Sequence, residues 1–506
     1  MDVLCCILVI CGTLYAPIIY TIGLGLMIIR ILFIGSWKNK IQNFKQQKII
    51  LLCLLSVYIL NIVGLIWTQN IAYGLRELNH KMPFLIIPIY MVAAYPIQKN
   101  TRNIIFSIYI ILITIGIIIG VINYAIDPYA DTRLLIPSAR NIAFGLNISL
   151  AVAFLCILTY KNELSKKISI PIIVIFVSFL FIASLISGII SLCILTIIGS
   201  LAIMARKNKK SASIAFGIVV LSVIASSVWL KMQYNDYFVP KESKQMPINE
   251  TTALGNTYTS TITNFIENGF YVDKYSCPTE VEQAWKNRTG EDLNTTCNAQ
   301  SPSSYTYASV IYRYLNSKGL KKDASGVKAL SDKDIENIKH GVANIVYTEK
   351  FSLRPRLYQT FYEFERYFRT GEVHQMSIIQ RLFWSNNALQ IIKANILIGT
   401  GTGDTRDALV SPVIDSHPEL CTTGCNPHNQ FLYSLAAFGL LGLAALIFFM
   451  LYAPLRLHLF KNPEFCAFFI VALCWMFAES SFMSYEGMTF ASLFMSYFCL
   501  NTSKLK

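Results

Sequence analysis

The stretch N-P-H-N-Q-F-L-Y-S-L-A-A-F-G-L-L-G-L-A-A-L-I-F-F-M-L, residues 426–451, joins a polar segment to a long apolar one. The apolar part, residues 433–451, has the length of a bilayer-crossing helix, which needs about 20 residues. Upstream lie Arg381, in R-L-F-W, and the glycine-rich I-G-T-G-T-G-D at 398–404. An arginine, a glycine turn and a histidine therefore precede a predicted membrane helix on polar sequence.

The composition of the whole chain indicates a membrane protein. Of 506 residues, 54% are hydrophobic and only 14% are charged, whereas soluble domains are about 25% charged. The net charge is +14, but basic and acidic residues nearly balance between 231 and 419. The positive excess lies beside the apolar runs, which is a signal of membrane topology and argues against nucleic acid as a partner.

The apolar runs predict an all-α polytopic membrane protein with about 12 transmembrane helices and one large extracytoplasmic loop domain. Residues 1–230 would form helices 1–9, and the first two would meet at a tight turn near Ala16-Pro17. Residues 231–427 would form a periplasmic loop domain that carries active-site residues, and 428–506 would form helices 10–12. The basic loops then fall on one side, which places both termini in the cytoplasm.

Two helices are expected inside the loop domain. Residues 331–345 open with Ser331-Asp332 and have an apolar face, which is typical of a capped amphipathic helix. Residues 352–369 carry apolar side chains at spacings of three or four. That spacing fits a helix on the membrane surface or an ordinary core helix of the domain, and the sequence leaves both open.

Four of the thirteen cysteines lie outside the apolar runs, in the long loop. An even number on an oxidising side favours two disulfides, most simply Cys277–Cys297 and Cys421–Cys425. The alternative is a zinc site made by His417, Cys421, Cys425 and His428. That spacing is not a familiar zinc pattern, so disulfides are expected and no metal site is.

Three features of the opening stretch could carry chemistry. His428 can take a proton near neutral pH, and Arg381 offers forked donors that match phosphate oxygens. The glycines at 399, 401 and 403 can bring backbone N–H groups to an anion. Each also has a structural alternative: an interfacial histidine, a solvated arginine and a sharp turn. A dinucleotide site is excluded because the preceding strand and the glycine spacing are missing.

Together, R-L-F-W, I-G-T-G-T-G-D, P-H-N-Q-F-L and the following F-G-L-L-G-L resemble the O-antigen ligase/polymerase superfamily of bacterial envelope glycosyltransferases. The specific part covers 381–443, and the rest is similar only in topology. The resemblance implies a metal-independent inverting enzyme without a cofactor in the bacterial inner membrane. It would move a glycan from undecaprenyl diphosphate to an acceptor hydroxyl of lipid A–core on the periplasmic face. His428 and Arg381 would be its catalytic residues.

Further residues are expected to complete this site. The expected substrate-binding residues are Arg354, Arg356, Arg140, Asn429, Gly401, Gly403 and Asp404. The three arginines are candidates for the second phosphate, because the Ser-Arg pair of many relatives is absent at 184–189. Glu479 and Glu486 are rare acidic residues near membrane depth, where such residues are often functional, although they could merely cap helices.

The sequence leaves other functions open. An O-antigen or capsule polymerase, or a protein O-glycan ligase, would share the fold and motifs and differ in the acceptor. A transporter or flippase for a lipid-linked glycan is the rival of another class. Transporters tend to carry polar residues at the bilayer midplane, whereas the polar residues here lie in a loop, which favours the enzyme.

Overall fold

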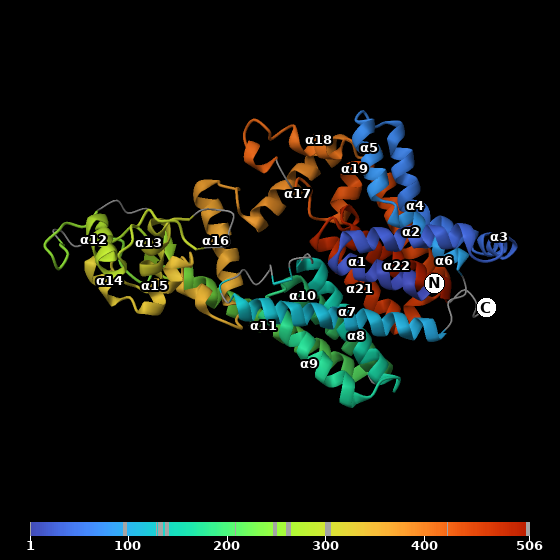
Figure 1. Cartoon of the computed structure of the whole chain (residues 1–506), viewed down its shortest axis with the longest axis horizontal. Helices are drawn as coiled ribbons and strands as arrows, with labels where there is room; N and C mark the ends of the chain where they lie inside the picture. The colour runs from blue at the N-terminus through green and yellow to red at the C-terminus, as the bar shows by residue number, and fades with distance from the viewer. Residues whose placement is uncertain are drawn as a thin grey trace. The chain divides into compact units, whose positions relative to one another are not determined.

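The computed structural model describes residues 2–94, 99–127, 129, 135–136, 141–207, 209–245, 250–259, 265–298, 305–421 and 424–501. The chain is mostly helical (Figure 1), as predicted. Within the described residues, the named strands form a short antiparallel hairpin, in which β1 (Ile266–Glu267) pairs with β2 (Phe270–Tyr271).

The chain divides into two compact units. The first contains 1–126, 132–199 and 373–506. Its helices are α1 (Asp2–Tyr15), α2 (Pro17–Phe33), α3 (Trp37–Gln46), α4 (Lys48–Val63), α5 (Ile71–His80), α6 (Pro83–Ala93), α7 (Lys99–Ile126), α8 (Asn141–Tyr160), α9 (Lys166–Ile182), most of α10 (Ile186–Lys207), α17 (Ser377–Ala394), α18 (Thr405–Val410), α19 (Gln430–Ile447), α20 (Ala453–Arg456), α21 (Pro463–Ala478) and α22 (Tyr485–Asn501).

The second unit contains 127–131 and 200–372. Besides the β1–β2 hairpin, it holds α11 (Lys209–Phe238), α12 (Pro278–Thr289), α13 (Tyr307–Ser317), α14 (Ala324–Ala329), α15 (Asp332–Lys339) and α16 (Arg354–Thr370). These boundaries differ from those expected at 230 and 427. Residues 373–427 belong to the first unit because α17 packs against α19, and α11 belongs to the second because it packs against α16.

Several helices are long and apolar enough to cross a membrane, which indicates a membrane protein. Among the described residues there are five, and a sixth if the pair α2 and α3, bent by 105°, is one span. Three further apolar helices are shorter, among them α1 with 14 residues and α21 with 16. The finer expectation of twelve spans therefore stays a prediction. The five are 48–66, 104–126, 141–160, 216–238 and 430–456.

Local sequence signals explain where helices begin. α1 ends at Tyr15 and α2 starts at Pro17, which confirms the predicted break, because proline suits the first turn of a helix but not its interior. In the second unit, Ser331 caps α15 through a reciprocal capping box with Asp334. The predicted helix over 331–345 is thus confirmed at its start, but it ends at Lys339.

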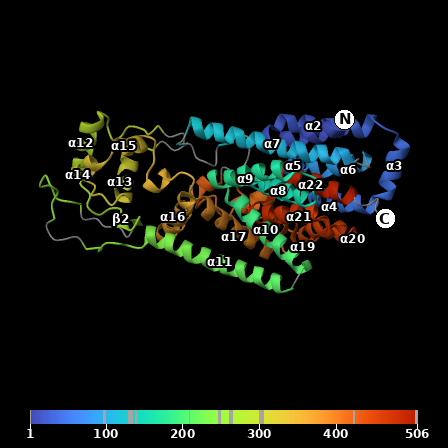
Figure 2. The same cartoon turned by 90° about the horizontal axis from the view of Figure 1, so that it is seen from below.

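Each unit has its own apolar core. In the first, Phe84 packs edge-to-face on Phe449 and on Phe482, with ring centroids 5.5 and 4.7 Å apart. This core fixes the segment between α21 and α22, which carries Glu479. In the second, Trp285 is fully buried beside Tyr307, and α12 to α15 gather together in both views (Figures 1 and 2).

Candidate functional site

Arg381, His428 and Glu479 meet in the first unit, although they are distant in sequence. Arg381 lies on α17, His428 lies two residues before α19, and Glu479 follows the last residue of α21. The Glu479 carboxylate accepts from Arg381 Nη2 at 2.5 Å and contacts His428 Nδ1 at 2.8 Å. One carboxylate therefore joins the two residues that the sequence predicts as catalytic.

The guanidinium of Arg381 is held at a second point. Its Nη1 donates to the carbonyl oxygen of Ala478 at 2.7 Å. The Arg381 side chain is 31% exposed and that of Glu479 is 24% exposed. The pair is thus oriented by the end of α21 and remains open to a ligand from solvent.

The backbone around His428 is unusual and is fixed by its neighbours. His428 has a φ of 47°, in the left-handed region that non-glycine residues seldom adopt. Its N–H donates to Asn426 Oδ1 at 2.9 Å, and Ser385 on α17 donates to the Pro427 carbonyl at 2.8 Å. These contacts aim the imidazole at Glu479, and strain of this kind is found at functional sites.

The residue after His428 begins α19. The Asn429 Oδ1 accepts from the N–H groups of Phe431 and Leu432 at 3.0 and 3.1 Å, so Asn429 is the N-cap. Its Nδ2 donates to the carbonyl oxygen of Phe477 at 3.4 Å. Asn429, which was expected to bind substrate, thus helps to join α19 to the end of α21 beside the site.

Gln430 makes a second connection between the same elements. Its side chain is 2% exposed, its Oε1 accepts from the Phe482 N–H at 2.7 Å, and its Nε2 donates to Ser434 Oγ at 3.0 Å. Gln430 therefore holds the segment that follows Glu479 against α19.

The electrostatics keep Glu479 ionised. Partial burial alone would raise the pKa of its carboxyl, but the hydrogen bond from His428 and the charge of Arg381 outweigh it and hold that pKa below its ordinary value of 4.5. A carboxylate at Nδ1 fixes the neutral imidazole with its proton on Nδ1. In that tautomer the Nε2 atom carries the free lone pair.

The glycine turn makes backbone hydrogen bonds to α19. α19 is interrupted at Gly439, where φ is 59° and ψ is −144°. The glycine turn packs against this break. Its backbone forms hydrogen bonds with the N–H and C=O groups of α19 that the break leaves unpaired, because buried backbone groups need hydrogen-bond partners. The hydrogen bonds are Thr400 N–H to Ala436 O at 3.0 Å, Gly401 N–H to Ala437 O at 2.8 Å, and Leu440 N–H to Ile396 O at 2.9 Å.

Three of the residues predicted to bind substrate make hydrogen bonds within the protein, and their role in binding stays a prediction. The N–H of Gly401 is used by α19, and that of Gly403 donates to Thr68 Oγ1 at 3.3 Å, so neither is aimed at an anion. The Asp404 carboxylate accepts from the N–H groups of Gln69 and Asn70 at 2.7 and 2.8 Å. It fixes the start of α5, whereas Glu479 is the residue that orients His428.

Two of the other predicted arginines make hydrogen bonds within the second unit. Arg354 and Arg356 belong to the second unit. Arg354 Nε donates to Gln233 Oε1 and to the Tyr237 hydroxyl, both at 3.0 Å, and Arg356 Nη1 donates to Gln359 Oε1 at 2.7 Å. The prediction for Arg140 lies outside the described residues.

The expected disulfides are absent from the part of the chain that the structure describes, where every cysteine is a thiol. The even number of cysteines in the loop did not show which sulfur atoms lie close together. In the structure each sulfur contacts an atom other than a second sulfur. Cys277 Sγ lies 3.6 Å from Thr279 Oγ1, and the carbonyls of Ile338, His417 and Leu420 accept from Cys297 at 3.6 Å, Cys421 at 3.5 Å and Cys425 at 3.4 Å.

The alternative zinc ligands are likewise not gathered. His417 Nδ1 lies 3.2 Å from Glu419 Oε1, while His428 is bound to Glu479. Within the described ranges, no group of three or more His, Cys, Asp or Glu side chains is placed to hold a metal ion.

The fold and site define a mostly helical protein with membrane-length apolar helices and an Arg–Glu–His cluster. No family model matches the chain, and no curated protein sequence is significantly similar to it. Glu479 stands out in the sequence as a rare acidic residue in an apolar context, but no sequence pattern places it beside Arg381 and His428. Glu479 and Gln430, as polar residues beside apolar runs, were the two signs in the sequence that pointed to these additional site residues.

Proposed function

We propose that the protein is a glycosyltransferase of the O-antigen ligase type. It moves a glycan from undecaprenyl diphosphate to an acceptor hydroxyl, with lipid A–core as the leading acceptor. The observation that carries this proposal is the junction of Arg381 and His428 on Glu479. A cation beside a histidine whose Nε2 is a free base suits a reaction that releases a diphosphate and removes a hydroxyl proton.

The proposed reaction is a direct displacement with inversion. The acceptor oxygen forms a bond to the anomeric carbon while the bond from that carbon to the diphosphate oxygen breaks. The hydroxyl proton passes to His428 Nε2, and Glu479 stabilises the imidazolium through Nδ1. Arg381 stabilises the negative charge that develops on the leaving diphosphate. The atoms balance without a cofactor or metal.

Topology is part of the proposal. We place the protein in the bacterial inner membrane with twelve spans, both termini cytoplasmic and the Arg381–Glu479–His428 site on the periplasmic face. The lipid-linked donor would be presented there after it has crossed the membrane. The basic residues beside the apolar runs support this orientation.

A comparison of variants distinguishes transfer from transport. His428→Ala and Arg381→Ala, each at normal protein level, are expected to leave the donor lipid on the periplasmic face, because transport precedes the lost step. Accumulation on the cytoplasmic face would instead identify a transporter. Glu419→Gln is a matched control, since Glu419 faces a different histidine at 3.2 Å.

A further inference from the structure

The C-terminal end of α11 bears a cluster of aromatic side chains. Residues 216–238 are long and apolar enough to cross a membrane. Tyr234, Tyr237 and Phe238 stand in their last two turns. Aromatic side chains, tyrosine in particular, gather where a spanning helix leaves the bilayer. The aromatic residues at the end of α11 therefore have the placement that is typical of a helix leaving the bilayer.

α16 is bound to this end of α11. The Tyr234 ring meets Phe361 edge-on at 5.6 Å, and Phe238 stacks on Tyr358 at 5.6 Å. Polar contacts reinforce the packing, since Tyr234 donates to a carboxylate on α16 and an arginine at its start donates to Tyr237. In Figures 1 and 2, α16 lies beside the C-terminal end of α11, and in Figure 1 it runs across that helix.

The far end of α16 exposes aromatic surface. Phe368 is 76% exposed and Tyr367 is 39% exposed, while Phe364 stacks on Phe368 at 6.2 Å. Exposed apolar area costs about 25 cal/mol per Å² in water. A pair of adjacent exposed aromatic residues, on a helix that packs against the end of a candidate spanning helix, is therefore suited to a lipid environment.

The charges at this end of α16 are already paired. Arg366 binds Glu372 at 2.7 Å, and Arg369 binds Glu365 at 3.0 Å. These pairs leave little net charge for anionic headgroups. Attraction to a bilayer would therefore come from the aromatic rings and would not need anionic lipid.

We propose that α16 is an interfacial helix whose Tyr367 and Phe368 insert into the headgroup region of the leaflet where α11 ends. The occupant of this surface is thus the bilayer itself. The inference is independent of the proposed transfer reaction. It resolves the two alternatives for residues 352–369 in favour of the membrane surface at the C-terminal end of α16.

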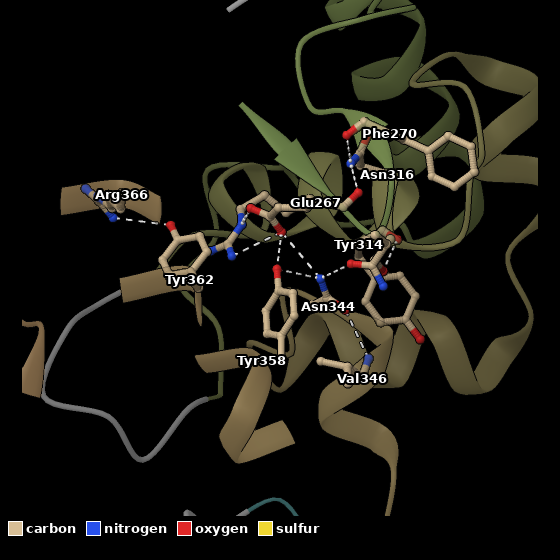
Figure 3. A network of polar contacts seen from close by, with 12 residues as sticks. Glu267, Phe270, Tyr314, Asn316, Asn344, Val346, Tyr358, Tyr362 and Arg366 are labelled. Atoms are coloured by element: carbon tan, nitrogen blue, oxygen red, sulfur yellow. Dashed lines mark hydrogen bonds and ion pairs between the residues drawn. The ribbon is translucent and has the colours of Figure 1, made fainter. Parts of the chain in front are cut away.

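The second unit would be anchored to the membrane through α16. Tyr358 on α16 donates to Glu267 on β1 at 2.7 Å, and Glu267, which is fully buried, also accepts from Arg313 at 2.8 Å. Asn344 donates to the Tyr358 hydroxyl at 2.8 Å (Figure 3). This network joins the membrane-facing helix to the hairpin and helices of the second unit.

Photocrosslinking of the full chain in lipid nanodiscs tests the proposal. A benzoylphenylalanine replaces Phe368 in one preparation and Leu254, which is 69% exposed in the same unit, in the other. Both positions are exposed, so folding is expected to tolerate either replacement. Nanodiscs of phosphatidylcholine alone, and of phosphatidylcholine with phosphatidylglycerol, are irradiated and the lipid adducts are counted by mass spectrometry.

Several-fold more lipid adduct is expected at 368 than at 254, with the same ratio in both lipid compositions. Equal adduct at the two positions would overturn the proposal. So would adduct at 368 that forms only with phosphatidylglycerol, because the attraction would then be electrostatic. Crosslinks from 368 to a second copy of the chain in place of lipid would also overturn it.

Discussion

At the scale of single residues, the Glu479 carboxylate contacts both Arg381 and His428 and so joins them in one cluster. It touches neither the expected diphosphate nor the acceptor hydroxyl in the proposed reaction, so it is a positioning residue. Its carboxylate contacts His428 Nδ1 and forms an ion pair with the partly buried guanidinium of Arg381. The chemistry of Nε2 depends on both effects.

Glu479→Gln is expected to lower kcat by about 100-fold, the lower range of general-base contributions. An amide can present its carbonyl oxygen to Nδ1–H, but it cannot stabilise the imidazolium by charge. KM for the acceptor should change little, and Glu479→Asp should restore part of kcat. The measurement is steady-state transfer by the folded variants, with Glu419→Gln as the control. An unchanged kcat in Glu479→Gln would remove Glu479 from the mechanism.

A second residue-scale feature is a buried lysine in the polar unit. Lys322 is 3% exposed, and its Nζ donates to the Lys274 carbonyl and to Asn316 Oδ1, both at 2.8 Å. Burial lowers the pKa of its ammonium from 10.5 to about 8, since desolvation disfavours the charged form.

The lowered pKa of Lys322 predicts that the stability of the second unit depends on pH. Between pH 8 and 10.5 the unfolded chain keeps a proton that the folded unit has released, so the free energy of unfolding should rise with pH in that window. The rise is about 3 kcal/mol over the whole window. Hydrogen exchange of α13, corrected for intrinsic rates, measures it. Lys322→Met should flatten the slope, and equal slopes in both proteins would contradict the assignment.

At the scale of elements, the break in α19 and the glycine turn at 398–404 depend on each other, because their backbone groups are hydrogen-bonded together. Each alone would leave backbone groups unpaired inside an apolar core. The turn also carries the chain from α17, which bears Arg381, back to α19, which follows His428. The glycines therefore serve the site indirectly, by fixing the helices that present its side chains.

Gly439→Ala is expected to be severely destabilising. Its φ of 59° is strained for alanine, and the added Cβ would lie 2.4 Å from the Leu397 carbonyl carbon. Gly25→Ala is the matched control, because a Cβ there meets nothing within 4 Å inside a helix. The yield of folded protein and its thermal midpoint measure both. Wild-type stability in Gly439→Ala would show that the turn does not depend on this break.

The sequence predicted elements better than contacts between them. Helix starts at Pro17 and Ser331 follow from rules that act within one turn, and the structure has both. The interruption of α19 could not be predicted, because Gly439 stands in an apolar run that reads as a continuous span. The break is hydrogen-bonded to the turn at 398–404, which is distant in sequence. Rules based on local sequence patterns cannot identify a partner that is distant in sequence.

At the scale of the whole molecule, the helical class and membrane-length apolar helices follow from composition. The junction of His428 with Arg381 was expected only through a resemblance. Glu479 lies 98 residues beyond Arg381, and only the folded chain brings them together. Residues 373–427 are polar in sequence but pack with the first unit, and the predicted division by membrane topology at 230 and 427 stays a prediction.

The central claim is that the Arg381–Glu479–His428 cluster performs metal-independent glycosyl transfer. The direct measurement is transfer by the purified full chain from undecaprenyl-diphosphate-linked glycan to lipid A–core, with a chelator present. The account predicts that the wild type forms product and releases undecaprenyl diphosphate, and that equally folded His428→Ala and Arg381→Ala lose at least about 100-fold in rate. Transfer abolished by the chelator, or undiminished in His428→Ala, would contradict it.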